Sequence, residues 1–109
     1  MSEPLDLRRV CERAVATFDR FDQIAKAVEE LNELGAALMR TAQNGFEPKD
    51  EHQRLAIVDE IADVRIMVEQ LTILFGDNNV GERIGFKLRR LDIKVVRHRV
   101  DAAMRKAAP

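Results

Sequence analysis

The stretch from Leu55 to Phe75 constrains the fold more than any other, because it predicts one long helix with acidic residues inside its apolar stripe. At roughly 100° per residue, eight apolar side chains fall on one broad face of this helix. They are Ile57, Ile61, Val64, Met67, Val68, Leu71, Leu74 and Phe75. Glu60 and Asp63 lie within or at the edge of that face, where a carboxylate loses hydration and needs a partner. Since these two acids are three residues apart, they are neighbours on the helix and repel each other. A shared cation would resolve both difficulties.

A second stretch repeats this arrangement. Residues 20–42 predict a long helix in which Glu30 and Glu33 form another acidic pair at the border of an apolar stripe. An antiparallel hairpin of the two helices can bring the pairs face to face near mid-helix. Hard divalent cations prefer oxygen ligands, and Mg²⁺ binds a few carboxylates while it keeps waters for a phosphate substrate. The sequence therefore predicts a metal centre made of Glu30, Glu33, Glu60 and Asp63.

Stop and start signals divide the rest of the chain into helices. In chain order these signals are the Asn44-Gly45 stop, the capping box of Asp50 and Gln53, the stop at Gly76 and the capping box of Asn79 and Glu82. Residues 4–18 predict a short first helix, and the last helix is predicted to run to about residue 105. Short connections make neighbouring helices antiparallel. We therefore expect one all-α domain over residues 1–109, with a fold like a four-helix bundle.

The charge balance bears on the partners of the chain. A net charge of −1 conceals an asymmetry, because residues 1–78 hold 9 basic and 16 acidic side chains, whereas residues 79–109 hold 9 and 3. The overall balance does not favour nucleic acid as a partner.

Cys11 is the single cysteine, so no internal disulfide forms and a reducing compartment is expected. No signal peptide or membrane-spanning stretch is recognisable, and we expect a cytoplasmic protein without a membrane partner.

The basic last helix carries the candidate phosphate contacts. Lys87 and Arg90 lie three residues apart and are suitable phosphate clamps. Lys26 could also reach a phosphate, although its spacing from Glu30 is equally that of an ordinary ion pair. Four apolar residues of the last helix have core spacing: Ile84, Leu88, Leu91 and Val95. Lys94, Arg97, His52 and His98 are given no role in a site.

Three motifs resemble the MazG-like nucleoside triphosphate pyrophosphohydrolases. They are EELNEL (Glu29–Leu34), DEIADV (Asp59–Val64) and FKLRRL (Phe86–Leu91), and the similar region covers about residues 22–96. The family's ExxE on one helix and ExxD on the next match the four acids. The resemblance implies an all-α bundle, obligate oligomerisation and Mg²⁺, with Mn²⁺ as an alternative ion; from the apolar residues on both sides of the long helix we expect a homodimer or homotetramer. It also implies hydrolysis of a nucleoside triphosphate to the monophosphate and pyrophosphate, as in control of the nucleotide pool.

Several alternatives bear on these expectations. Glu30 and Glu33 are equal candidates for the base that activates water. A helical oligomeric module that binds without catalysis is the alternative from another class. A ferritin-like di-iron protein is excluded because no Glu-x-x-His pair occurs, and a P-loop enzyme because no GxxxxGK[ST] motif occurs. A second apolar set on the long helix, Val58, Ala62 and Ile66, is predicted to lie between subunits.

Overall fold

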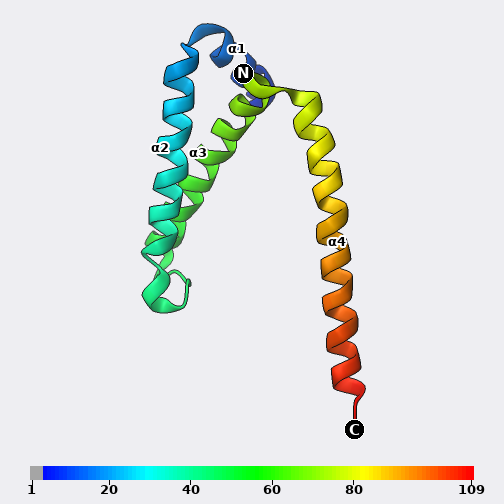
Figure 1. The fold of residues 1–109 in the computed structure, drawn as a ribbon. Helices are drawn as coiled ribbons and strands as arrows, with labels where there is room; N and C mark the ends of the chain where they lie inside the picture. The colour runs from blue at the N-terminus through cyan, green and yellow to red at the C-terminus, as the bar shows by residue number, and fades with distance from the viewer. Residues whose placement is uncertain (1–3) are drawn as a thin grey trace. The chain divides into compact units, whose positions relative to one another are not determined.

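The computed structural model describes residues 4–109, which contain helices and no β-strand. In chain order the elements are α1 (Leu7–Thr17), α2 (Arg20–Met39), the 3₁₀ turn η1 (Ala42–Asn44), α3 (Glu51–Phe75) and α4 (Asp77–Ala107), as Figure 1 shows. The predicted all-α class is confirmed. Within this described part, no helix has a stretch that is both long and apolar enough to cross a bilayer. The chain divides into two compact units, residues 1–75 and residues 76–109, and each is described by itself.

The first helix is fixed at its start by a cap and along its length by α3. Asp6 is the N-cap, and its side chain accepts a backbone hydrogen bond from the first turn at 2.9 Å. The helix therefore begins at residue 7 and not at residue 4. Cys11 is buried, and its thiol donates to the carbonyl oxygen of Ile66 at 3.6 Å. An ion pair of 3.0 Å between Arg8 and Glu69 adds a second link between α1 and α3.

Helices α2 and α3 form an antiparallel hairpin, and a buried pair of amides defines its register. The Gln23 Nε2 donates to the Gln70 Oε1 at 3.1 Å. Glu30 follows Gln23 by seven residues, and Asp63 precedes Gln70 by seven residues. Seven residues are about two helical turns, or about 10 Å, so Glu30 comes level with Asp63. The predicted antiparallel packing of these two helices is confirmed.

The interior of this hairpin is narrow. Its buried apolar residues include Ala27 and Ala37 of α2 and Met67 of α3. Because alanine has a short side chain, the two backbones approach closely and α2 covers only a strip of α3. Ile61 and Val68 consequently remain 44% and 46% exposed. The broad apolar face predicted for α3 is therefore only partly buried within the described chain.

The connection between α2 and α3 contains two residues in the left-handed region. Gly45 and Phe46 have φ values of 68° and 64°, and only glycine adopts this conformation without a steric penalty. The helix predicted to reach residue 42 ends at residue 39, and η1 follows. Asp50 Oδ1 accepts from the Gln53 backbone N–H at 2.8 Å, and Gln53 Oε1 accepts from the Lys49 N–H at 2.8 Å. This reciprocal cap confirms the predicted start of α3.

The unit of residues 76–109 consists of α4 and its ends. Gly76, with φ at 125°, ends α3 and is also the N-cap of α4. The predicted start at the capping box of Asn79 is therefore wrong, because α4 begins at Asp77, directly after the N-cap Gly76. The predicted core positions Ile84, Leu88, Leu91 and Val95 are all exposed. A unit made of one helix has no second element that could cover its apolar stripe.

Candidate metal centre

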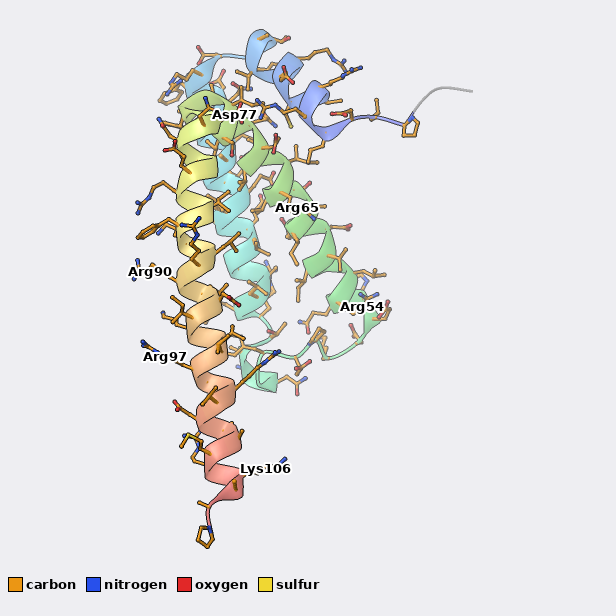
Figure 2. All side chains as sticks on the ribbon, turned by 90° about the vertical axis from the view of Figure 1, so that its right-hand side faces the viewer. Arg54, Arg65, Asp77, Arg90, Arg97 and Lys106 are labelled. Atoms are coloured by element: carbon orange, nitrogen blue, oxygen red, sulfur yellow. The ribbon has the colours of Figure 1, made fainter. Side chains whose placement is uncertain are left out.

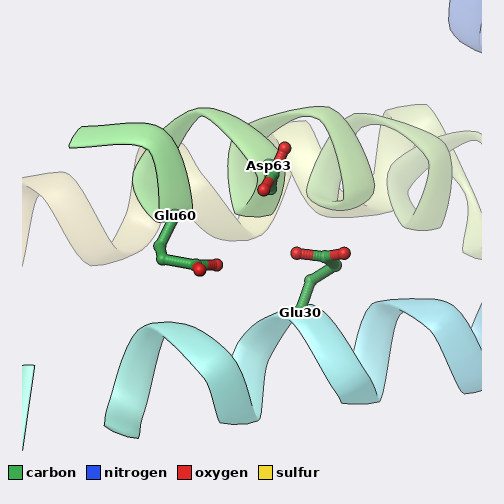
Figure 3. A group of neighbouring side chains, drawn as sticks. All are labelled: Glu30, Glu60 and Asp63. Atoms are coloured by element: carbon green, nitrogen blue, oxygen red, sulfur yellow. The ribbon is translucent and has the colours of Figure 1, made fainter. Parts of the chain in front are cut away.

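Three carboxylates converge between α2 and α3 near the middle of the hairpin. Figure 3 shows Glu60 and Asp63 of α3 and Glu30 of α2 turned toward one another. One carboxylate oxygen from each residue lies within 4.8 Å of the other two. The three-residue spacing places Glu60 and Asp63 on one side of α3, and the hairpin register brings Glu30 level with them. These three residues are called the acid centre below.

Two carboxylate oxygens of the acid centre are buried and unpartnered among the described residues. Glu30 is 7% exposed, Glu60 is half-buried and Asp63 is exposed. The Oε2 atoms of Glu30 and Glu60 are buried and accept no hydrogen bond from the described residues. A buried polar atom without a partner costs about 1–3 kcal/mol, and more when the group is charged. A bound cation would give these two atoms a partner and would offset the charge of the three carboxylates.

The geometry of the three oxygens fits a hard divalent cation. Magnesium–oxygen bonds of about 2.0–2.1 Å allow two ligand oxygens to be at most about 4.2 Å apart. The oxygens of the acid centre lie within 4.8 Å of one another, so no pair would have to close by more than about 0.6 Å for Mg²⁺. Because the donors are all carboxylates, the set suits Mg²⁺, Mn²⁺ or Ca²⁺ better than a softer metal. Glu30, Glu60 and Asp63 could therefore hold such an ion.

Lys26 is the basic side chain that pairs with the acid centre. Its Nζ lies 3.1 Å from Glu30 Oε1 and 3.5 Å from Glu29 Oε1. The hydrogen bond to Glu30 and then the charge of Glu29 raise the pKa of Lys26. The ion-pair interpretation of Lys26 and Glu30 is thus confirmed, whereas contact of Lys26 with a phosphate stays a prediction.

Glu33 lies beside the acid centre and is not part of it. Its side chain is exposed, and its oxygens are outside the group of three. The negative charge of Glu30, followed by partial desolvation and the charge of Glu60, raises the pKa of Glu33. On the helical wheel Glu33 is turned about 60° away from Glu30, toward the side of the hairpin. The structure thus brings three of the four predicted acids together and places the fourth within their electric field.

Lys87 and Arg90 lie on α4. Together with Leu91 and Lys94 they line a shallow groove of about 310 Å³. Figure 2 shows Arg90 and Arg97 projecting from this helix. The predicted grouping of Lys87 with Arg90 on one face is confirmed within this unit, and Lys94 joins them. That they bind phosphate stays a prediction.

Two pockets of the hairpin unit contain polar residues that the sequence patterns did not single out. One, of about 310 Å³, is lined by Ala14, Phe18, Asp19, Asp22, Gln23, Lys26, Met67 and Gln70. The other, of about 220 Å³, is lined by Ala37, Arg40, Lys49, His52, Gln53, Ala56 and Ile57. Neither set has a recognisable spacing in the sequence, because each combines residues from separate elements. The hydrogen bond between Gln23 and Gln70 fixes the alignment of α2 with α3, and both pockets could have been predicted only with that alignment known.

Comparison of the chain with models of protein families, with curated proteins and with solved structures found no match. The resemblance to the MazG-like family therefore remains a prediction that rests on the sequence motifs.

Proposed function

We propose that this chain is a MazG-like pyrophosphohydrolase that converts a (deoxy)nucleoside triphosphate to the monophosphate and pyrophosphate with Mg²⁺, or Mn²⁺, as its ion. One observation carries the proposal: Glu30, Glu60 and Asp63 converge from two helices, with buried carboxylate oxygens that have no hydrogen-bond partner. An ordinary solvated acidic face does not bury a glutamate to 7% exposure. The sequence motifs supply the reaction class.

The reaction requires few groups from the protein. A water oxygen forms a bond to the α-phosphorus, the bond to the α–β bridging oxygen breaks, and pyrophosphate leaves with that electron pair. When bound, Mg²⁺ neutralises charge on the triphosphate and on the leaving oxygens. Glu30, Glu60 and Asp63 would hold the ion, and a carboxylate beside them would take the proton of the water. Glu33 suits this second role, because it lies beside the ligand group and is not part of it.

Assembly into a homodimer or homotetramer is part of the proposal. Val58 and Ile66 are each 43% exposed on α3, and Ala62 between them is also exposed. These residues form an apolar strip that the described chain leaves uncovered. A second copy of α3 packed on this strip would remove it from water and complete a bundle of helices.

The test is release of pyrophosphate. The natural chain, incubated with mixed deoxynucleoside triphosphates and Mg²⁺, should form pyrophosphate and nucleoside monophosphates in equal amounts. Glu60→Gln should form neither, whereas the matched change Glu82→Gln on α4 should retain the activity. Nucleotide binding without any pyrophosphate from the natural chain would contradict the enzyme and favour the non-catalytic binding module.

A further inference from the structure

The smaller of the two pockets is basic and lies at the loop end of the hairpin. Three of its lining residues, Arg40, Lys49 and His52, carry basic side chains, and none of its lining residues is acidic. These three residues are called the basic pocket below. No ion pair joins any of them to a described residue. Its volume of about 220 Å³ is below the ~300–1,000 Å³ typical of a site for a whole drug-sized ligand, and it suits a small anion.

The carboxylates closest in sequence to the basic pocket are engaged elsewhere. Glu51 accepts from the Arg54 guanidinium at 2.8 Å, and Asp50 caps the first turn of α3. None of these neighbours, nor Glu47, forms an ion pair with Arg40, Lys49 or His52 within the described residues. Arginine and lysine in such a setting favour an anion with several oxygens, above all a phosphate.

The basic pocket is in line with the acid centre. Ala37 follows Glu30 by seven residues, Ala56 precedes Asp63 by seven residues, and both alanines line the basic pocket. Seven residues are about 10 Å along a helix and return to nearly the same face. The basic pocket thus lies about two turns from the acid centre, along the same side of the hairpin. The long Arg40 and Lys49 side chains can shorten that separation.

The pocket on the other side of the acid centre has the opposite character. It offers the Phe18 ring, the Met67 thioether and the amide of Gln70. It also contains the carboxylates of Asp19 and Asp22 and a single ammonium group, that of Lys26, which is paired with Glu30 and Glu29. Carboxylates repel a phosphate, whereas a ring, a thioether and an amide suit a flat heterocycle with polar edges. The two ends of the hairpin therefore differ in the part of a nucleotide that they would accept.

We propose that the basic pocket takes the pyrophosphate end of the substrate, so that the nucleotide lies along the hairpin with its base toward Phe18 and Met67. This proposal rests on the proposed function, because it places the bond to be broken at the acid centre. Arg40 can donate two parallel N–H bonds to phosphate oxygens, and Lys49 adds a point charge. Both residues then stabilise the leaving group and hold the product after the bond has broken.

Binding of inorganic pyrophosphate tests the proposal without any turnover. Calorimetry in Mg²⁺ at fixed ionic strength should give binding to the natural chain that is about tenfold weaker in Arg40→Gln and in Lys49→Gln. Arg65→Gln removes the same charge from α3 outside the basic pocket and should leave the affinity unchanged (Figure 2). Pyrophosphate should also shift the backbone amide resonances of residues 49–53 in nuclear magnetic resonance spectra. Lys49 lies in the loop, so Lys49→Gln still decides the matter if Arg40→Gln loses its helical circular dichroism.

The outcomes separate this proposal from the proposed function. Unchanged pyrophosphate affinity in both pocket variants would overturn the placement of the leaving group. A loss confined to Lys87→Gln would also overturn it, because the anion would then bind on α4. Binding that depends on Arg40 and Lys49, in a chain that releases no pyrophosphate from any nucleotide, would support the anion site and contradict the enzyme.

Discussion

A divalent cation should stabilise this protein against heat, and the substitution Glu60→Gln should abolish most of that effect. In the absence of metal, the carboxylates of Glu30, Glu60 and Asp63 repel one another across the hairpin, with one oxygen of each inside a 4.8 Å group. The neutral glutamine is nearly isosteric and removes one of these charges. Glu60→Gln should therefore melt at the same temperature as the natural chain, or higher, when no metal is present.

The size of the metal effect follows from mass action. An ion that binds only the folded state at 100 times its dissociation constant stabilises that state by about 2.7 kcal/mol. The acid centre belongs to the unit of residues 1–75. For a unit of this size, 1 kcal/mol shifts the melting temperature by about 4–8 °C. The natural chain should therefore melt about 11–22 °C higher in saturating Mg²⁺.

Thermal melts followed by circular dichroism measure this shift. Mg²⁺ is added at constant ionic strength, so that general screening does not contribute, and Glu82→Gln serves as the matched loss of one carboxylate that is not a member of the acid centre. Glu82→Gln should respond to Mg²⁺ as the natural chain does. An equal response to Mg²⁺ in Glu60→Gln and in the natural chain would show that these acids hold no ion, and the proposed enzyme would fail with them.

Three further predictions concern the amides, the outer acid and the exposed strip. Gln23→Met leaves the Gln70 oxygen unpartnered in a buried position and should cost about 1–3 kcal/mol in urea unfolding; adding Gln70→Leu should recover part of that loss. The raised pKa of Glu33 means that the folded state binds more protons than the unfolded state just above pH 4.5, so this group lowers stability as pH rises through that window. Without metal, Glu33→Gln should therefore melt above the natural chain at pH 7, and the difference should vanish below about pH 4 in a pH series of melts. Light scattering at micromolar concentration should give a dimer or tetramer mass, and Ile66→Lys should shift it toward the monomer; a monomer mass for the natural chain would contradict the predicted assembly.

The periodicity of the sequence was enough to predict the α2–α3 hairpin. The apolar positions of residues 55–75 and the reciprocal cap of Asp50 and Gln53 are local signals, and the structure confirms both the helix and its start. Glu60 and Asp63 could be paired from their three-residue spacing alone. The convergence of Glu30 with them required the further assumption of an antiparallel partner, which the structure also shows.

Features that depend on contacts between elements could not be predicted in the same way. The pockets combine residues such as Phe18 with Met67, and Arg40 with His52, which have no common period in the sequence. The start of α4 at Asp77 was not predicted, because Gly76, with φ at 125°, is itself the N-cap of this helix. The capping pattern at Asn79 therefore lies inside α4. Such outcomes are decided by backbone conformation and three-dimensional register, which a pattern along one helix does not contain.

The amide pair of Gln23 and Gln70 has a consequence for how a ligand would be captured. A slip of the hairpin by one turn, about 5.4 Å, would break this hydrogen bond and leave the Gln23 N–H and the Gln70 carbonyl oxygen without each other as partners in the interior. Uncharged groups therefore align Glu30 with Asp63 in the folded chain without the help of an ion. An ion that meets ligands already in position does not have to supply the ordering entropy of two helices. Capture of the ion should then be limited by its dehydration and by access to the hairpin, and not by a rearrangement of the protein backbone.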